Sequence, residues 1–316
     1  MLSNKLEAIP ETLGSSEVGT QTDDSLKDID SLLWLPEISE REATEWLTFL
    51  RWVRLADRYL ERDIFQKPPH NSLYTFRDFV VDWHKIRHGK VADTPHATLF
   101  NRLRQRWKKE RMTEGSLQIW DLYLESLEKY VRPGLIIVDM RGYERALYGL
   151  SGTFFQGFPL APKKYHEQIG VLGMLDQFFN NLRDLYEDIS RGISYFPVTL
   201  LEEFGIQKIE EQVTNPDEKW IKLTQYLLTS FVPSLKSRAD PMLSLDWINS
   251  RECPYSWRCM IQNNLRRYGR ITHVLNESGY NGEKFSPAYW DAVRADLPPE
   301  TRSKFLTFTR TLKLEV

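Results

Sequence analysis

The sequence has little of several features that mark particular classes of protein. It contains two cysteines in 316 residues, Cys253 and Cys259, which are too few for a disulfide framework and are typical of a reducing compartment. Its 42 basic and 44 acidic residues give a formal net charge of −2, and the basic residues are scattered among acidic ones, which argues against a nucleic-acid-binding protein. The longest apolar run, at residues 135–138, is far shorter than the roughly 18 residues of a membrane span. With no signal peptide in view, we expect a cytoplasmic protein.

Several sequence patterns of well-known sites are also missing. We find no G-x-S-x-G, no phosphate-binding loop and no dinucleotide fingerprint. We also find no sustained alternation of apolar and polar residues, which would predict strands, and no internal repeat. These absences leave an all-helical protein as the simplest expectation.

Apolar residues recur at three- and four-residue steps along most of the chain, which predicts helices. The predicted helices are residues 40–63, 73–88, 97–109, 116–130, 140–149, 165–190, 218–231 and 257–267. A hydrophobic content of 41% is ample for a large core. Residues 1–29 are rich in Ser, Thr, Asp and Glu and predict a disordered acidic tail. We therefore predict an all-α protein with one domain at residues 30–316.

Two carboxylates one helical turn apart, Asp184 and Asp188, form the most informative pattern. Gln177 and Asn180 continue the same face, because residues three and four apart lie one above another on a helix. The opposite side is apolar and comprises Leu175, Phe178, Leu182, Leu185 and Ile189. Mg²⁺ prefers oxygen ligands and keeps several waters, so such a pair suits a metal that bridges to a phosphate-bearing substrate. On spacing alone, a solvated helix face is the alternative, since the pattern is weak.

The whole segment around these carboxylates resembles the second aspartate-rich motif of the squalene/phytoene synthase superfamily. That motif reads Q-x-x-N-x-x-R-D-x-x-x-D, followed by Arg-Gly and by an aromatic-x-Pro. The matching residues are Gln177, Asn180, Arg183, Asp184, Asp188, Arg191, Gly192, Tyr195 and Pro197. This match is far more specific than the two carboxylates alone.

A second carboxylate pair resembles the first aspartate-rich motif of the same superfamily. Arg54, Asp57 and Glu61 lie at steps of three and four on one helix face, as an arginine precedes D-x-x-x-D by three residues in that motif. Glu61 replaces the last aspartate, which keeps the carboxylate but lengthens the side chain. Taken alone, the pair would be ordinary surface charge, because Arg58 and Arg62 lie beside it.

The resemblance implies an isoprenoid-synthase-type helical bundle with a central active-site cavity, where metal ions hold a diphosphate between the two motifs. The implied Mg²⁺ ligands are Asp57, Glu61, Asp184 and Asp188, and the implied diphosphate contacts are Arg54, Asn180, Arg183, Arg191 and Tyr195. An allylic diphosphate ionises when Mg²⁺ and arginine donors neutralise the departing group. Aromatic rings would shield the carbocation, although an aromatic stripe is more often core packing; the candidates are Phe154, Phe155, Phe178 and Phe179.

The resemblance spans roughly residues 32–206. Within and just before this span, the sequence also departs from the pattern of the superfamily. The implied substrate pocket comprises Tyr148, Gly152, Phe154, Phe155 and Gln177. Two of these, Phe154 and Phe155, stand where small residues normally line a tunnel for a long prenyl chain. The serine, phenylalanine and basic residues that precede the first motif in other members are not reproduced at residues 26–31.

These changes spare the residues for one prenyl diphosphate and alter those for a second. They predict a prenyltransferase of secondary metabolism that transfers the prenyl group from an allylic prenyl diphosphate to a small aromatic. One alternative is head-to-head condensation with a second prenyl diphosphate as acceptor. Another is an inactive member that serves as an assembly or binding protein, against which the retained D-L-Y-E-D of residues 184–188 argues. Peripheral contact with a membrane is left open, and no nucleic acid is expected as a partner.

Overall fold

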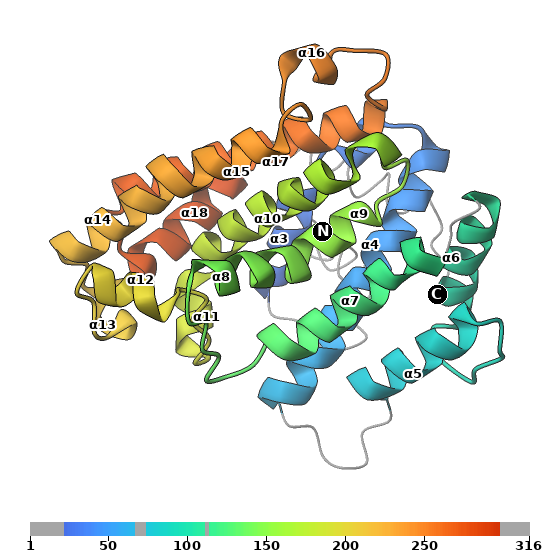
Figure 1. Ribbon diagram of the computed structural model, residues 1–316, viewed down its shortest axis with the longest axis horizontal. Helices are drawn as coiled ribbons and strands as arrows, with labels where there is room; N and C mark the ends of the chain where they lie inside the picture. The colour runs from blue at the N-terminus through green and yellow to red at the C-terminus, as the bar shows by residue number, and fades with distance from the viewer. Residues whose placement is uncertain (1–21, 67–73, 111–113, 298–316) are drawn as a thin grey trace, which may run out of the picture. The chain divides into compact units, whose positions relative to one another are not determined.

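A computed structural model describes residues 22–66, 74–110 and 114–297, and over these ranges the chain forms helices and no strands (Figure 1). The predicted all-α class is therefore confirmed. The chain divides into two compact units, of which the first extends to Glu128 and the second begins at Lys129. The single domain at residues 30–316 stays a prediction.

The first unit consists of long helices. They are α3 (Thr22–Leu32), α4 (Glu40–Glu61), α5 (Phe76–Arg87), α6 (Ala97–Glu110) and α7 (Glu114–Tyr130), with a 3₁₀ turn at Leu35–Glu37 and a π-helical turn at Arg62–Gln66. Helix α4 packs against α5 and α6. Polar caps fix two of the helix starts: Ser39 accepts a hydrogen bond from the backbone N–H of Glu42 at 3.3 Å, and Thr75 and Asp78 form a capping box before α5.

Helix α3 corrects the predicted boundary of the tail. Leu26, Ile29 and Leu32 recur at three-residue steps and are all buried, so this acidic segment has an apolar face that packs. Asp28 and Asp30 are buried beside them. The folded chain thus includes residues 22–29, whereas residues 1–21 lie outside the described ranges, and there the tail stays a prediction.

An aromatic core fixes the rotation of α4. Four helices contribute buried tryptophans to one cluster: Trp52 from α4, Trp83 from α5, Trp107 from α6 and Trp120 from α7. The ring centroids of Trp52 lie 4.7 Å from those of Trp83 and 4.8 Å from those of Trp120, within the range of favourable aromatic pairs. With Trp52 held inward, the face that carries Arg54, Asp57 and Glu61 is only half-buried.

The burial of His96 predicts a pH-dependent stability for this unit. Its Nε2 lies 2.8 Å from the hydroxyl of Tyr59, and burial, assisted by the positive Arg51, lowers the pKa of His96 to about 4. In the unfolded chain the pKa returns to about 6.5. The unfolded state therefore takes up a proton between these values while the folded state does not, so stability is complete above pH 6.5 and falls by up to about 3 kcal/mol as the pH drops to 4.

We accordingly expect the free energy of unfolding to fall more steeply between pH 7 and pH 4.5 in the wild type than in a His96→Gln variant. Urea titrations at the two pH values measure this difference, and the side-chain carboxylates common to both proteins cancel in the comparison. Equal pH slopes would show that His96 does not titrate in this way.

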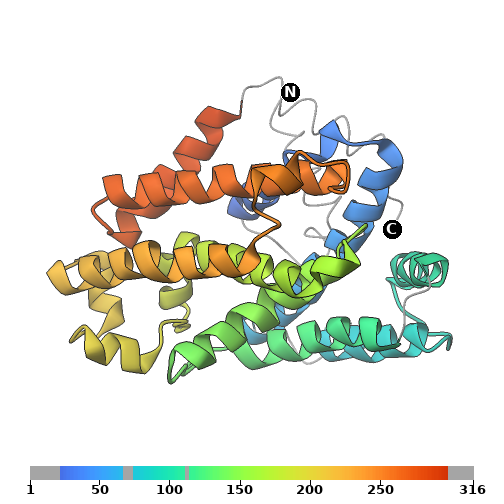
Figure 2. The ribbon, with the colours of Figure 1, turned by 45° about the horizontal axis from the view of Figure 1, so that its top comes forward.

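The second unit is built around α10 (Figure 2). Its helices are α8 (Met140–Leu147), α9 (Thr153–Gln156), α10 (His166–Arg183), α11 (Leu185–Ser190), α12 (Val198–Glu203), α13 (Ile209–Thr214), α14 (Glu218–Tyr226), α15 (Val232–Ala239), α16 (Leu245–Ile248), α17 (Tyr255–Glu277) and α18 (Gly282–Asp296). A 3₁₀ turn at Lys163–Tyr165 precedes α10. Helix α10 packs against α8, α9, α15 and α17.

Two π-helical turns each connect two helices of this unit into one longer, continuous helix. Such π-helical turns often occur at functional sites. One, at Tyr148–Gly152, links α8 to α9, and the other, at Leu227–Phe231, links α14 to α15. The first lies so close to α10 that a Cβ on Gly152 would be 2.8 Å from the carbonyl oxygen of Gly170. This approach of two backbones requires glycine.

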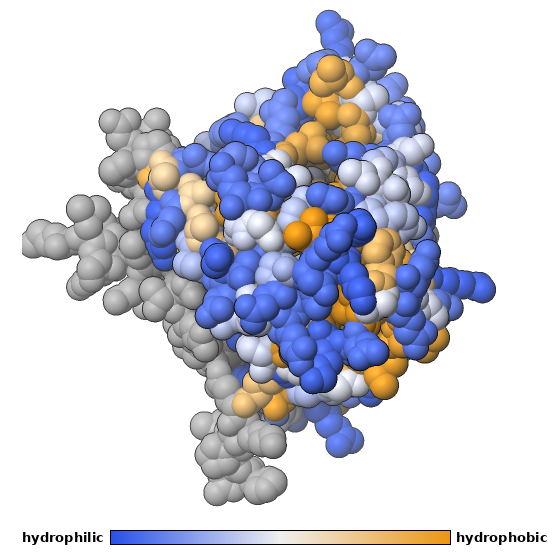
Figure 3. Space-filling model, turned by 90° about the vertical axis from the view of Figure 1, so that its left-hand side faces the viewer, coloured by the Kyte–Doolittle hydropathy of each residue, from blue (hydrophilic) through white to orange (hydrophobic). Residues whose placement is uncertain are grey.

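Within the described ranges, no helix has both the length and the apolar character needed to cross a bilayer. The face at the end of the second unit near α13 carries mostly hydrophilic residues, with apolar ones in smaller groups among them (Figure 3).

Candidate functional site

The second aspartate-rich motif lies at a break between two helices. Helix α10 ends at Arg183, Asp184 has φ −94° and ψ 5°, and α11 begins at Leu185. The predicted continuous helix at residues 165–190 is therefore divided. The backbone N–H of Asp184 nonetheless donates to the carbonyl of Asn180 at 2.9 Å, and that of Asp188 to the carbonyl of Asp184 at 2.8 Å. Both carboxylates thus keep the one-turn spacing that the sequence predicts.

The polar stripe of this motif is half-buried. Gln177, Asn180, Asp184 and Asp188 all have intermediate exposure. The apolar side is buried at Leu175, Phe178, Leu182 and Leu185, and half-buried at Ile189. The predicted apolar side is confirmed at the four buried positions, whereas Ile189 is exposed to the same degree as the polar stripe. Half-burial suits side chains that meet a ligand, because it lowers the local dielectric while leaving access.

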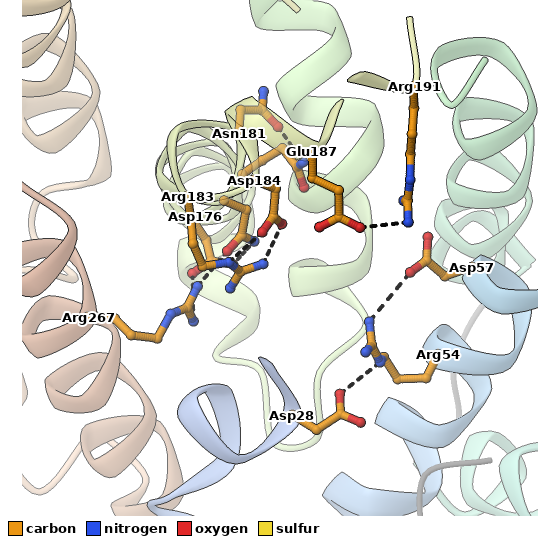
Figure 4. Close-up of polar contacts among 12 residues, drawn as sticks. Asp28, Arg54, Asp57, Asp176, Asn181, Arg183, Asp184, Glu187, Arg191 and Arg267 are labelled. Atoms are coloured by element: carbon orange, nitrogen blue, oxygen red, sulfur yellow. Dashed lines mark hydrogen bonds and ion pairs between the residues drawn. The ribbon is translucent and has the colours of Figure 1, made fainter. Parts of the chain in front are cut away.

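Two of the predicted diphosphate contacts bind carboxylates of their own motif (Figure 4). Arg183 donates from Nε and Nη2 to the two oxygens of Asp184, at 2.9 and 2.6 Å. Arg191 Nη2 lies 2.6 Å from Glu187 Oε1. A guanidinium that binds a carboxylate through two parallel hydrogen bonds can bind phosphate with the same geometry. These pairs therefore supply positive groups suited to an anionic ligand.

A buried network that the sequence did not predict surrounds Asn180. Its side chain contacts Asp176 on α10 and Arg267 on α17, and Asp176 also accepts a hydrogen bond from the hydroxyl of Tyr268 at 2.9 Å. Burial, and then the nearby Asp176 carboxylate, raise the pKa of Tyr268 well above its usual value, so the hydroxyl stays protonated and donates. The sequence offers one local signal, the four-residue step from Asp176 to Asn180, and none for Arg267.

The first motif, in the other unit, also has an arginine between carboxylates. Arg54 Nε lies 2.9 Å from Asp28 Oδ1 of α3, and Arg54 Nη1 lies 3.5 Å from Asp57 Oδ2 (Figure 4). Glu61 lies 3.8 Å from Arg58 Nη1. Asp28 lies within residues 1–29, for which the sequence predicts a disordered tail, so the sequence does not indicate this contact. Its carboxylate is 5% exposed, which makes it the most buried acid of this group.

Tyr123 on α7 lies close to the same carboxylates. Burial raises its pKa well above the usual value, and the negative charges of Asp57 and Glu61 act in the same direction. Tyr123 therefore remains a neutral hydroxyl beside the first motif.

The predicted pocket residues lie on the π-helical turn at Tyr148–Gly152, on α9, and on α10. Tyr148 donates to Gln156 Oε1 at 3.1 Å, and Gln177 donates to Asn181 Oδ1 at 2.8 Å. Gly152 is buried in the contact with α10 described above. Phe155 is buried and Phe154 half-buried.

The structure thus gathers the second-motif residues on α10, α11 and the segment that follows, where Tyr195 is buried. Asp57 and Glu61 belong to the first unit, so their place in one site with Asp184 and Asp188 stays a prediction. Over the described residues, no cluster of three or more His, Cys, Asp or Glu side chains is arranged to hold a metal ion. Pairs of carboxylates are nevertheless what Mg²⁺ uses when substrate phosphates complete its coordination.

The described helices define an all-α fold of the isoprenoid synthase class. The crystal structure of a dehydrosqualene synthase in complex with ligand has a similar fold, with a TM-score of 0.66 and 14% sequence identity over 97% of this chain and 98% of that one. No family model and no curated protein matches the chain. The resemblance predicted from the two motifs is confirmed at the level of the fold, which extends over the C-terminal third where the motifs give no information.

Proposed function

We propose that the chain is a prenyltransferase that ionises an allylic prenyl diphosphate, transfers the prenyl group to a carbon acceptor and releases diphosphate. The observation that carries this proposal is the half-buried stripe Gln177, Asn180, Asp184 and Asp188 with guanidinium groups beside it. Carboxylates next to guanidiniums on an otherwise buried helix suit a ligand that combines a cation with phosphate. The fold shared with a dehydrosqualene synthase supports the same chemistry.

Mg²⁺ fits the donor set, because the candidate ligands Asp57, Glu61, Asp184 and Asp188 offer only oxygen atoms and are accessible in part. When bound, Mg²⁺ would supply the positive charge that lets the diphosphate depart. Arg54, Arg183 and Arg191 would exchange a carboxylate partner for phosphate oxygens, with Asn180 and Tyr195 as further contacts.

Of the four aromatic residues proposed to shield the cation, Phe178 and Phe179 are buried in the core, and Phe179 stacks on Tyr268 with centroids 4.3 Å apart.

For the acceptor we propose a small electron-rich aromatic compound. Phe154 and Phe155 form a cluster with Phe158, with centroids 4.6 Å apart for Phe155 and Phe158. This cluster occupies volume that a long prenyl chain would need if the pocket lies along α9. The similarity in fold to a dehydrosqualene synthase favours head-to-head condensation as the second candidate.

One experiment separates these functions. Purified protein is incubated with Mg²⁺ and allylic diphosphates of about 10 to 20 carbons, with and without small phenols, and both released diphosphate and products are measured. A prenylated phenol supports our proposal, whereas a symmetric hydrocarbon or its cyclopropyl intermediate from prenyl diphosphate alone supports the second candidate. If no diphosphate is released with any acceptor, both are wrong. EDTA should stop the reaction.

Opening the phenylalanine cluster should widen the range of donors. In the double variant Phe154→Val with Phe155→Gly, we expect longer prenyl donors or a second prenyl diphosphate to be accepted, because two large rings are removed. Phe155 is 2% exposed, so its truncation should also lower the free energy of unfolding by about 3–5 kcal/mol. The single variant Phe154→Val should cost less, since Phe154 is half-buried.

Product chain length and urea unfolding measure the two effects separately. Phe204→Val is a matched control, because Phe204 is also half-buried and packs on Tyr226 of α14, outside the predicted pocket. If the range of accepted prenyl donors changes equally in the control, the phenylalanine cluster does not line the substrate pocket.

A further inference from the structure

Asn180 is held at both ends of its side-chain amide. Its Oδ1 accepts a hydrogen bond from Arg267 Nη2 at 2.6 Å, and its Nδ2 donates to Asp176 Oδ2 at 3.1 Å. Arg267 Nη1 lies 3.4 Å from Asp176 Oδ1, so the two partners of the amide are themselves an ion pair. The side chains of Arg267 and Asp176 are only 4% and 7% exposed.

The chemistry of these partners permits one orientation of the amide. A guanidinium has only donors, and a carboxylate only acceptors. The carbonyl oxygen of Asn180 must therefore face Arg267, and its NH₂ group must face Asp176. A rotation by 180° would set oxygen against oxygen and donor against donor.

The network leaves part of the amide available. An amide side chain offers two lone pairs and two N–H groups, and these bonds use one of each. Asn180 is half-buried, so the remaining lone pair and N–H can meet a ligand. The bond from the positive Arg267 also polarises the carbonyl oxygen.

Burying the ion pair of Arg267 and Asp176 costs desolvation free energy, and the attraction between the two charges often does no more than offset that cost. Well-packed apolar residues in place of a buried pair often leave stability unchanged or improved. Asp176 instead accepts hydrogen bonds from Asn180 and Tyr268 and forms an ion pair with Arg267. The contacts with Arg267 and Tyr268 join α10 to α17. The arrangement defines the geometry of a single side chain on the polar stripe.

We propose that Arg267 and Asp176 are positioning residues that fix the Asn180 amide for binding the diphosphate with its metal. Arg267 acts through Asn180, because its own guanidinium is buried and bound to the protein. This inference rests on the proposed function of the site. It adds a contribution from α17, which lies outside the two aspartate-rich motifs.

The test compares Arg267→Gln with the wild type in two measurements. We expect kcat/KM with an allylic diphosphate to fall about 10- to 100-fold, as is usual when a partner that orients a ligating group is lost. We expect the dissociation constant of inorganic pyrophosphate, measured by calorimetry with Mg²⁺, to rise in parallel. In an Asn180→Ala background, the same substitution should have almost no further effect, because the group through which Arg267 acts is gone.

Arg270→Gln is the matched control. Arg270 lies on the same helix, is 15% exposed and pairs with Asp296 at 2.8 Å, outside this network. It should bind pyrophosphate and turn over like the wild type. If Arg267→Gln does not fold, Arg267→Lys keeps the charge without the planar fork and should show a smaller loss in the same two measurements.

The outcomes are distinguishable. If the wild type is active but Arg267→Gln matches it per folded molecule, or if the losses in Arg267→Gln and Asn180→Ala multiply, the positioning role is wrong and the proposed function stands. If the wild type neither binds pyrophosphate with Mg²⁺ nor releases diphosphate, the proposed function is wrong and the positioning role falls with it.

Discussion

Replacing Asp188 by asparagine should lower kcat by about a thousand-fold or more, which corresponds to about 4 kcal/mol of lost transition-state stabilisation. The substitution removes one negative charge from the proposed metal ligands and changes the shape of the side chain little. Asp188 is half-buried and lies on the polar stripe, away from the packed face of α10 and α11. Helix content measured by circular dichroism should therefore stay unchanged.

Asp184→Asn should lose activity to the same degree and stability as well. Asp184 accepts two hydrogen bonds from the buried Arg183, and an amide can accept with only one of its two atoms. The free energy of unfolding should fall by about 1–3 kcal/mol in urea titrations. The exposed Glu203 on α12 supplies the control Glu203→Gln, which should change neither quantity. Full activity in Asp184→Asn or Asp188→Asn, or in EDTA, would exclude the metal-assisted mechanism.

The polar stripe could be predicted from the sequence because its information is local. Steps of three and four residues from Gln177 to Asp188 fix a shared helix face wherever the helix packs. The break at Asp184 could not be predicted in this way, since periodicity reports which side a residue faces and not its backbone angles.

The partners of the two motifs could not be predicted, because they come from distant parts of the chain. Arg267 reaches Asn180 from α17, and Asp28 reaches Arg54 from α3. No spacing links residues so far apart. The acidic residues around Asp28 predict disorder, and a folded helix is indicated there only by the apolar residues Leu26 and Ile29, which are buried in the structure.

Helix boundaries in the C-terminal third depended on packing. The predicted helix 257–267 stops before Gly269, a residue that costs about 1 kcal/mol within a helix. Helix α17 nevertheless continues to Glu277, because Ile271 and Leu275 beyond it are buried and outweigh that cost. The predicted helices do not include α18, which contains Pro287 in its interior. Asn281 caps this helix by accepting a hydrogen bond from Lys284 N–H at 2.9 Å.

Glu61 provides the sharpest test of the first motif, because the resemblance and the surface-charge alternative predict different results. As a metal ligand, Glu61 should be essential for rate, and Glu61→Gln should lower kcat by about a hundred-fold. As a surface charge, it would affect stability by no more than about 0.5 kcal/mol and the rate not at all. The structure predicts a small effect on stability in either case, since the 3.8 Å contact with Arg58 is long and Glu61 is 29% exposed.

The matched variant Glu61→Asp separates charge from side-chain length. It restores the aspartate of the D-x-x-x-D pattern, so it should retain most of the activity that Glu61→Gln loses, if the carboxylate is what matters. We would measure kcat and urea unfolding for both variants and for Arg58→Gln, which breaks the same ion pair without changing Glu61. The comparison shows whether a loss of rate comes from the Glu61 carboxylate or from the broken ion pair. Wild-type rates in Glu61→Gln would mean that Glu61 is surface charge and that the metal ligands of this unit lie elsewhere.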